Sequence, residues 1–526
     1  MDADHLLTRR TVLATATAGV AAGAFPQTSV ARRLRREPFA RAGTFASGVA
    51  SGQPNQRGIT LWTRLHDIGA SERLGMEIAR DPGFARVVHR ETIRAAAVRD
   101  FTARTRVLTR RLDPGERYFY RFFTRTTQSP VGAFKTLRPP DSREPVRIGW
   151  FSCQRYEHGF FTPHAGLAAE EDLDLVVSLG DYLYEEDSPA KLAEREQSTG
   201  DPNGHVETLE QWRAKHRLYR SDASLQAMHA AHPVIAIWDD CEVEGNWAGE
   251  GPSSGPSPVG PRSVPFSVKQ RNGFLTFFEN MPQEPIGSER FRIYRRLRLG
   301  GLVDLFLLDT RKYRDPQPCE DATFEGDVPP CLDADRPGRK RVGPAQQRWL
   351  TAGLERAQAT WKVLGNAQMM MALDIAPTRP VGYDSWDGYG AERRAILEQV
   401  RASGVENLVS IVGDVHTFFA GELHTTGRIG SPVVGTEFVG TSVSHDGIEV
   451  VGDEQQSALV TDRIVLSNPH LRYAKFGVRG YSVLEARPDE LRVDFKGVRS
   501  VLAPTSETYL LKSFRVAAGT PRVRPA

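Results

Sequence analysis

The sequence has only four cysteines in 526 residues, a formal net charge of +3, no internal repeat and, after residue 25, no long apolar run. The absence of a run long enough to span a bilayer excludes an integral membrane protein and predicts a soluble mature chain without transmembrane contacts. The small net charge gives no evidence for a nucleic-acid partner, and the basic cluster at 31–41 is typical of a tether beside a leader. The chain is too long for one compact core, so we expect two domains with short appendages.

The first residues have the pattern of an export signal. Arg9 and Arg10 precede an apolar run of small residues at 14–25, and Ala22-Gly23-Ala24 offers a cleavage site of the A-x-A type. The run is too short to span a bilayer, and paired arginines are typical of the twin-arginine route, which carries folded proteins. An accidental pair in an ordinary secretory leader is the alternative. We predict a signal peptide over 1–24, a contact with the twin-arginine export machinery, and a secreted or periplasmic protein.

The four cysteines are of two kinds. Cys319 and Cys331 flank an acidic, proline-rich segment at 320–330, which predicts a disulfide in an exported protein. Cys153 and Cys241 lie far apart in the sequence, each inside a dense cluster of polar residues. They need a separate explanation.

Short alternating strands dominate the first part of the chain. The runs at 58–65, 102–108 and 117–124 are separated by turn residues, a spacing typical of a small antiparallel β-sandwich. We assign this domain to 40–138, followed by a linker at 139–142.

Beyond residue 145 short apolar runs alternate with longer helical stretches. The runs lie at 146–151, 173–179, 234–238, 303–308, 361–365 and 408–412, and the helices include 346–356 and 392–401. Apolar, β-branched runs of this kind predict strands of an α/β sheet buried on both faces, whose carboxyl ends carry the site. We assign 145–510 to this second domain and expect a surface loop at the Ser/Pro/Gly-rich segment 251–260.

Four of these strands end in side chains of the types that bind metal ions. The clusters are Ser152-Cys153-Gln154, Gly180-Asp181-Tyr182-Leu183-Tyr184-Glu185, Asp239-Asp240-Cys241-Glu242 and Gly413-Asp414-Val415-His416. Each alone has an ordinary explanation, such as a turn, a core histidine or an inert thiol. Together they would bury many charges at one sheet edge, which is costly unless metal ions compensate them. The donor types favour a hard or borderline cation such as ferric iron, calcium or manganese over structural zinc.

With these motifs the chain resembles the calcineurin-like and purple-acid-phosphatase-like metallophosphoesterases, and more closely the PhoD-like alkaline phosphatases and related secreted phosphodiesterases. The matching stretches are 46–54 with 61–64, 152–154, 180–185, 238–243, 308–314, 386–389 and 413–416. Their order and spacing extend over nearly the whole mature chain. The resemblance implies an α/β fold, a four-layer sandwich of β-sheets flanked by helices, with a small N-terminal antiparallel β-sandwich domain. It also implies phosphoric ester hydrolysis.

The resemblance also implies a ligand set. Cys153, Asp181, Tyr184 and His416 would hold a ferric ion. Asp181 would bridge to a calcium site completed by Asp240 and Asp414, with help from Asn246; manganese and zinc are alternative metals. Close-set metal ions suit this reaction because they polarise phosphoryl oxygens and lower the pKa of a bound water. The predicted catalytic residues are Asp181, Asp240, Cys241, Asp414 and His416.

Cys241 departs from the family pattern, which usually has histidine in an Asp-Asp-His-Glu motif. That histidine is well placed to bind phosphate or protonate the leaving group, whereas a thiol with a pKa near ~8.5 is a different acid. Cys241 is an inert filler, a metal ligand, an altered acid or a redox partner of Cys153. Arg155, His158 and Arg311 are candidates to replace the histidine.

The predicted function is a secreted, metal-dependent phosphomonoesterase or phosphodiesterase, expected to be a monomer. Its substrate is a phosphoester of a small molecule, a lipid or a nucleotide. The alternatives are a phospholipase D-like phosphodiesterase and a catalytically weakened phosphoester-binding protein, the latter suggested by Cys241.

Overall fold

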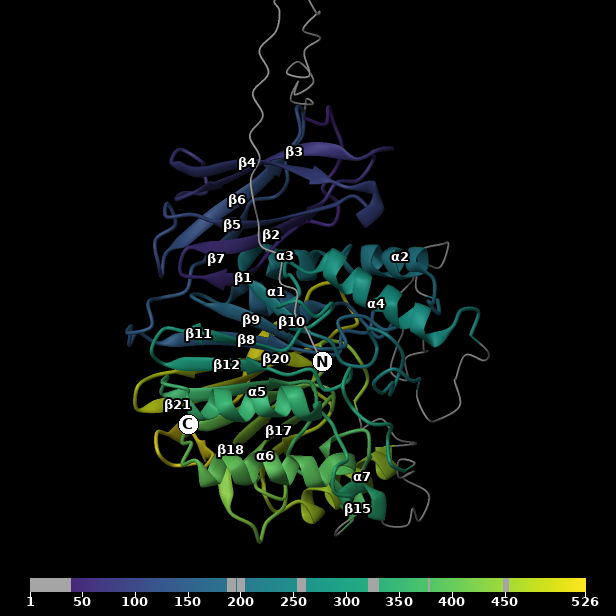
Figure 1. Cartoon of the computed structure of the whole chain (residues 1–526), viewed down its shortest axis with the longest axis vertical. Helices are drawn as coiled ribbons and strands as arrows, with labels where there is room; N and C mark the ends of the chain where they lie inside the picture. Colours follow the sequence, from purple (N-terminus) through teal and green to yellow (C-terminus); the bar gives the residue numbers. More distant parts are fainter. Residues whose placement is uncertain are drawn as a thin grey trace, which may run out of the picture. The chain divides into compact units, whose positions relative to one another are not determined.

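The computed structural model describes residues 39–186, 195, 204–252, 262–319, 331–376, 379–447 and 454–526. The predicted leader at 1–24, the acidic segment 320–330 and most of the predicted loop at 251–260 lie outside these residues. Figure 1 shows the elements in sequence colours.

The N-terminal part contains two antiparallel sheets with a common core. One sheet has the order β1-β2-β5 and the other β4-β3-β6-β7. Their strands are β1 (Val49–Asn55), β2 (Gly58–Arg64), β3 (Glu72–Ala79), β4 (Val87–Ala95), β5 (Thr102–Leu108), β6 (Arg117–Phe123) and β7 (Gly132–Lys135), with a 3₁₀ turn η2 (Ala97–Arg99) before β5. On β6 the alternate residues Tyr118, Tyr120 and Phe122 are fully buried, as the period of two in a half-buried strand requires. The expected β-rich N-terminal region is confirmed.

The rest of the chain contains two seven-stranded mixed sheets. The first has the order β10-β9-β8-β20-β21-β22-β23 and the second β11-β12-β13-β16-β18-β17-β19. The strands of the first are β8 (Val146–Phe151), β9 (Leu175–Leu179), β10 (Val234–Ile237), β20 (Gly480–Ala486), β21 (Glu490–Val498), β22 (Thr508–Ala517) and β23 (Arg524–Pro525). Those of the second are β11 (Arg295–Leu299), β12 (Val303–Leu307), β13 (Trp361–Asn366), β16 (Leu408–Val412), β17 (Phe418–His424), β18 (Val433–Val439) and β19 (Leu471–Lys475). A small hairpin joins β14 (Asp374–Ala376) to β15 (Arg379–Pro380).

Successive side chains on the strands of the second sheet point to opposite faces, so this sheet contributes to two separate hydrophobic cores. On β16, Val409 and Ile411 belong to the core that both sheets share, whereas Leu408 and Val412 pack into a second core with helices. The helices of that second core are α5 (Gly343–Glu355), α6 (Gly390–Ala402) and α7 (Glu454–Ser467). Helices α1 (Thr162–Ala169), α2 (Leu209–Tyr219), α3 (Ala223–Ala231) and α4 (Phe266–Asn280) contribute to the shared core instead. The predicted four-layer α/β sandwich is confirmed (Figure 1).

The remaining described elements are the turns η3 (Leu332–Asp335) and η4 (Trp386–Tyr389). The strands expected at 102–108, 146–151 and 408–412 have the predicted bounds, and the other expected strands differ by a residue or two. The antiparallel strands β17 and β19–β23 had no counterpart in the prediction.

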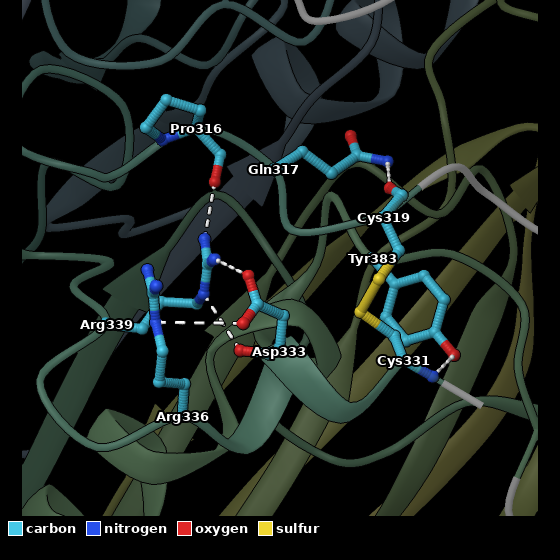
Figure 2. Close-up of a disulfide and its surroundings, with 8 residues drawn as sticks. All are labelled: Pro316, Gln317, Cys319, Cys331, Asp333, Arg336, Arg339 and Tyr383. Atoms are coloured by element: carbon cyan, nitrogen blue, oxygen red, sulfur yellow. Dashed lines mark hydrogen bonds and ion pairs between the residues drawn. A yellow bond between two sulfur atoms is a disulfide. The ribbon is translucent and has the colours of Figure 1, made fainter.

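The predicted disulfide between Cys319 and Cys331 is confirmed, with 6.1 Å between the two Cα atoms. Figure 2 shows how its ends are held: Gln317 Nε2 donates to the Cys319 carbonyl (2.7 Å), and the Cys331 amide donates to the Tyr383 hydroxyl (3.2 Å). The crosslink therefore holds Cys319 close to Cys331, whose amide is bound to Tyr383.

The layer model predicts where the stability lies. Ile411 is fully buried between the two sheets, whereas Leu502 is 56% exposed. Ile411→Ala should lower the free energy of unfolding by ~2–5 kcal/mol because it leaves a cavity. Leu502→Ala should change it by no more than about 0.5 kcal/mol. Denaturant unfolding of both variants measures this, and equal losses would contradict the assigned layers.

Candidate metal centre

The carboxyl ends of β8, β9, β10 and β16 meet at one place. Strands β8, β9 and β10 are parallel neighbours in the first sheet, so the residues that follow them emerge at the same edge. Gly413, directly after β16, brings the second sheet against this edge. A Cβ at Gly413 would lie 2.6 Å from Ser152 Oγ and 3.4 Å from Leu179 Cβ, so only glycine permits this approach.

Asp181 is shared by three groups of potential ligand atoms, within each of which the atoms lie within 4.8 Å of one another. The groups are Cys153 with Asp181 and His416, Asp181 with Asp240 and Cys241, and Asp181 with Asp239 and Asp414. Tyr184 joins the first group, because its hydroxyl donates to Asp181 Oδ2 (3.1 Å). The amide of Cys241 donates to the other oxygen, Asp181 Oδ1 (3.4 Å). The two oxygens of Asp181 thus contact different residues, an arrangement compatible with a bridging ligand.

The cluster has an unusual backbone. Positive φ angles, which side chains with a Cβ rarely adopt, occur at Cys153 (59°), Asp181 (52°), Asn246 (57°), Asp414 (64°) and His416 (58°). Each such residue costs roughly 1–3 kcal/mol and persists only where the surroundings hold it. This concentration of strain is typical of a functional site.

Glu242 holds two of the loops. Its buried carboxylate accepts hydrogen bonds from the amides of Asp181 (3.2 Å), Tyr182 (2.7 Å) and Asp239 (2.9 Å). Burial nevertheless raises the pKa of Glu242 to about 8. Glu242 was part of the sequence motif, but no role was predicted for it; the structure gives it a positioning role.

The cluster is short of positive charge. Burial first, and then the neighbouring carboxylates, raise the pKa of Asp181 and Asp414 well above the usual range. Burial also raises the pKa of Asp240 to about 6, although Arg311 opposes the shift. The same cause lowers the pKa of His416 to about 3, so its imidazole is neutral and able to bind a cation.

Two further atoms fit a metal centre. Within the described part of the chain, the buried Nε2 atom of His416 has no hydrogen-bond partner. One end of the Asn246 side-chain amide lies 3.1 Å from Asp240 Oδ2 and 3.2 Å from Asp384 Oδ2. Either its nitrogen donates to these carboxylates or its oxygen joins them around a cation. The donors present therefore suit metal ions.

Arg311 is the main cation on the Asp240 side. Its guanidinium is fully buried and donates to both oxygens of Asp239 (2.7 and 3.0 Å) and to Asp384 (2.9 Å). Asp384 in turn binds Arg314 (2.6 Å) and Gln368 (2.9 Å). Arg311 is thus committed to carboxylates, which argues against it as a replacement for the family histidine.

The other two candidates for that role lie on the Tyr184 side. The guanidinium carbon of Arg155 is 4.3 Å from the centre of the Tyr184 ring. His158 is 3.7 Å from an Asp446 carboxylate oxygen, and its ring lies 4.7 Å from the ring of His445. His445 also lies 4.1 Å from the ring of His416 and 5.1 Å from that of Tyr184.

All seven predicted ligands gather at this cluster. Asp239, Asp384, Gln368 and His445 were missed as site residues. Two of these residues could have been found from the motifs: Asp239 is part of Asp239-Asp240-Cys241-Glu242, and Asp384 lies two residues before the stretch 386–389. His445 follows no predicted strand, so the sequence held no signal for it. Cys153 and Cys241 are both free thiols, so the disulfide considered between them is absent here.

Two mixed sheets flanked by helices, with carboxylates, thiols and imidazole at one edge, define a metallophosphoesterase-type fold. A solved purple acid phosphatase from yellow lupin seeds shares it, with a TM-score of 0.52 at 12% identity over 89% of this chain and 73% of that chain. The model of the PhoD-like phosphatase family matches residues 148–495, and the model of its N-terminal domain matches 27–138.

Two relatives are much more similar. Alkaline phosphatase D of Bacillus subtilis is 33% identical over 486 residues, covering 89% of this chain and 80% of that protein. A solved structure of PhoD has a TM-score of 0.81 at 30% identity and covers 93% of both chains. The chain therefore belongs to the PhoD-like phosphatase family and is a phosphoric ester hydrolase.

The role of Arg311 as a buried counter-ion can be tested. Arg311→Gln should lower the free energy of unfolding by ~3–5 kcal/mol, because it leaves buried carboxylates uncompensated. The loss should be larger after chelation than with metal bound, since bound cations supply the missing charge. Denaturant unfolding in both states measures this. Arg492→Gln is the control: its surface pair with Asp494 (2.8 Å) should contribute no more than about 1 kcal/mol. Equal losses in both states would contradict the role.

Proposed function

We propose that this phosphatase acts outside the cytoplasmic membrane and works with one ferric ion and calcium, bridged by Asp181. The observation that supports this most is the sharing of Asp181 among three ligand groups. A bridging carboxylate places two cations close together, as phosphoester hydrolysis requires.

The iron side consists of Cys153, Asp181, Tyr184 and His416. A thiolate, a phenolate, a carboxylate and an imidazole suit ferric iron. All four donors are at one side of the cluster, and burial raises the pKa of both Cys153 and Tyr184 well above the usual range. A strongly charged cation would overcome that cost and stabilise the deprotonated forms.

The calcium side consists of Asp240, Asp414 and Asn246 with the second oxygen of Asp181. Oxygen donors from carboxylates and an amide are the ligands that calcium prefers. The backbone amide of Asn246 donates to Asp240 Oδ2 (2.7 Å), and this bond keeps the Asn246 side chain beside that carboxylate.

The bound cations would polarise the phosphoryl group and lower the pKa of the attacking water. The chain itself orients these ions. Glu242 fixes the loops of Asp181 and Asp239, while Arg311 balances Asp239 and Asp384. With Cys241 in place of histidine, esters with good leaving groups should be the better substrates, because they depart without a proton donor.

The substrate is a phosphomonoester or phosphodiester of a small molecule, a lipid or a nucleotide. The complete ligand set argues against the alternative of a weakened binding protein. We propose that the leader at 1–24 directs export by the twin-arginine pathway. We also propose that the protein is a monomer. Among the described residues, no helix has both the length and the apolar character needed to cross a membrane.

The metal assignment predicts a coloured protein. Metal analysis should find about one iron and one or two calcium ions per chain. Phenolate-to-iron charge transfer should give a visible absorption band. Tyr184→Phe should remove or shift this band while circular dichroism stays unchanged. A colourless protein that contains zinc alone would overturn the assignment.

Asp181 should be the least replaceable residue. Asp181→Asn should lose more than the roughly 10–100-fold that an outer-shell partner costs, because it weakens both metal positions. Rates on nitrophenyl phosphate and bis-nitrophenyl phosphate, with metal content from the same sample, measure this. Asp494→Asn on β21 is the matched control and should retain full activity. Near-normal hydrolysis by Asp181→Asn would place the centre elsewhere.

A further inference from the structure

Cys241 belongs to the second ligand group, together with Asp181 and Asp240. Its Sγ lies within 4.8 Å of a carboxylate oxygen of both Asp181 and Asp240. Its amide donates to Asp181 Oδ1 (3.4 Å) and to Asp240 Oδ1 (3.0 Å). The residue is therefore fastened to both carboxylates, and its half-buried thiol is a free one. The two hydrogen bonds come from the backbone amide and hold the residue in place, whereas the position of Sγ beside the two carboxylates is what makes the thiol a potential ligand.

An independent observation comes from Glu185. This side chain is 3% exposed, and its Oε1 atom accepts from the amide of Gly245 (2.6 Å). Its Oε2 atom is buried and has no hydrogen-bond partner within the described part of the chain. Gly245, whose amide Glu185 binds, directly precedes Asn246, whose backbone amide donates to Asp240 Oδ2 (2.7 Å), so Glu185 is attached to the loop that follows Cys241. A buried, unpartnered carboxylate oxygen beside this group is costly unless a cation lies near it.

The donor chemistry then decides which cation fits. Calcium takes oxygen donors, whereas a thiolate with carboxylates suits a borderline cation such as zinc. We propose that Cys241, Asp181 and Asp240 form a thiolate–carboxylate position at which zinc binds in competition with calcium. The inference rests on the proposed use of Asp181 as a bridging ligand. On binding, the thiol releases its proton to solvent, and no electron transfer takes place.

The competition follows from shared ligands. Asp181 and Asp240 belong both to this position and to the oxygen-rich calcium side, so zinc and calcium draw on the same carboxylates and each lowers the affinity for the other. Cys153 does not take part, because it belongs to the ligand group of Asp181 and His416 and not to that of Asp240.

Cobalt is the spectroscopic probe, added to the mature protein with its iron in place. A near-ultraviolet thiolate-to-cobalt band should grow until about one equivalent is bound. Zinc should abolish the band, and excess calcium should move the titration to higher cobalt concentrations. Cys241→Ser and Cys241→Ala should lack the band. A matched control adds the exposed Ser403→Cys substitution to Cys241→Ser, which restores the number of free thiols away from the site and should not restore the band.

A second measurement needs no variant. Zinc should slow the labelling of Cys241 by a thiol reagent roughly tenfold or more, with the labelled peptide identified by mass spectrometry. If Cys241→Ser fails to fold, this protection decides the question. An equal cobalt band in wild type and Cys241→Ser, or unchanged labelling of Cys241 with zinc, would overturn the proposal. The visible iron band and ester hydrolysis of the untreated protein test the proposed function separately, because neither depends on cobalt or zinc.

Discussion

The compensation of buried negative charge is the constraint on which the rest of this structure depends. Asp181, Asp239, Asp240, Asp414 and Glu242 are gathered at the meeting point of the two sheets. The chain supplies only part of the opposing charge, through Arg311 and through three backbone amides on Glu242. Carboxylates whose pKa remains raised despite these partners are neutralised either by protons or by bound cations. A cation that binds here would therefore also stabilise this edge of the sheets.

The fold meets this constraint by close approach of backbones. Gly180 has a φ of +102°, and a Cβ there would lie 2.6 Å from Asp239 Cβ. A Cβ at Gly413 would likewise have no room, because Gly413 follows β16 and lies against Ser152 at the end of β8. These two glycines allow loops from different strands, and from both sheets, to place their side chains around Asp181. The neighbouring positive φ angles then turn Cys153, Asp414 and His416 toward the same point.

The strands and their polar ends could be predicted from the sequence because they are local. Val146–Phe151 and Leu408–Val412 are short apolar runs, and each is followed by side chains predicted to bind metal ions. The parallel pairing of β8 with β9 then follows from the fold class. Asp384 and His445 could not be found in this way, because each lies in a loop, and loops have no hydrophobic periodicity from which their position can be predicted. The roles of Glu242 and Arg311 were hidden for another reason: a motif shows that a charged residue is present but not which charges it faces.

Cys241 shows why those facing charges matter. A cationic imidazole at this position would add positive charge to a group of carboxylates that lacks it, whereas the half-buried thiol of Cys241 adds none. Arg311 cannot make up the difference, since Asp239 and Asp384 already share its guanidinium. Arg155 lies over the ring of Tyr184, with its guanidinium carbon 4.3 Å from the ring centre. The exchange therefore leaves Asp181 and Asp240 more dependent on a bound cation than an imidazole would. It also supplies the sulfur that lets that cation be a softer one than calcium.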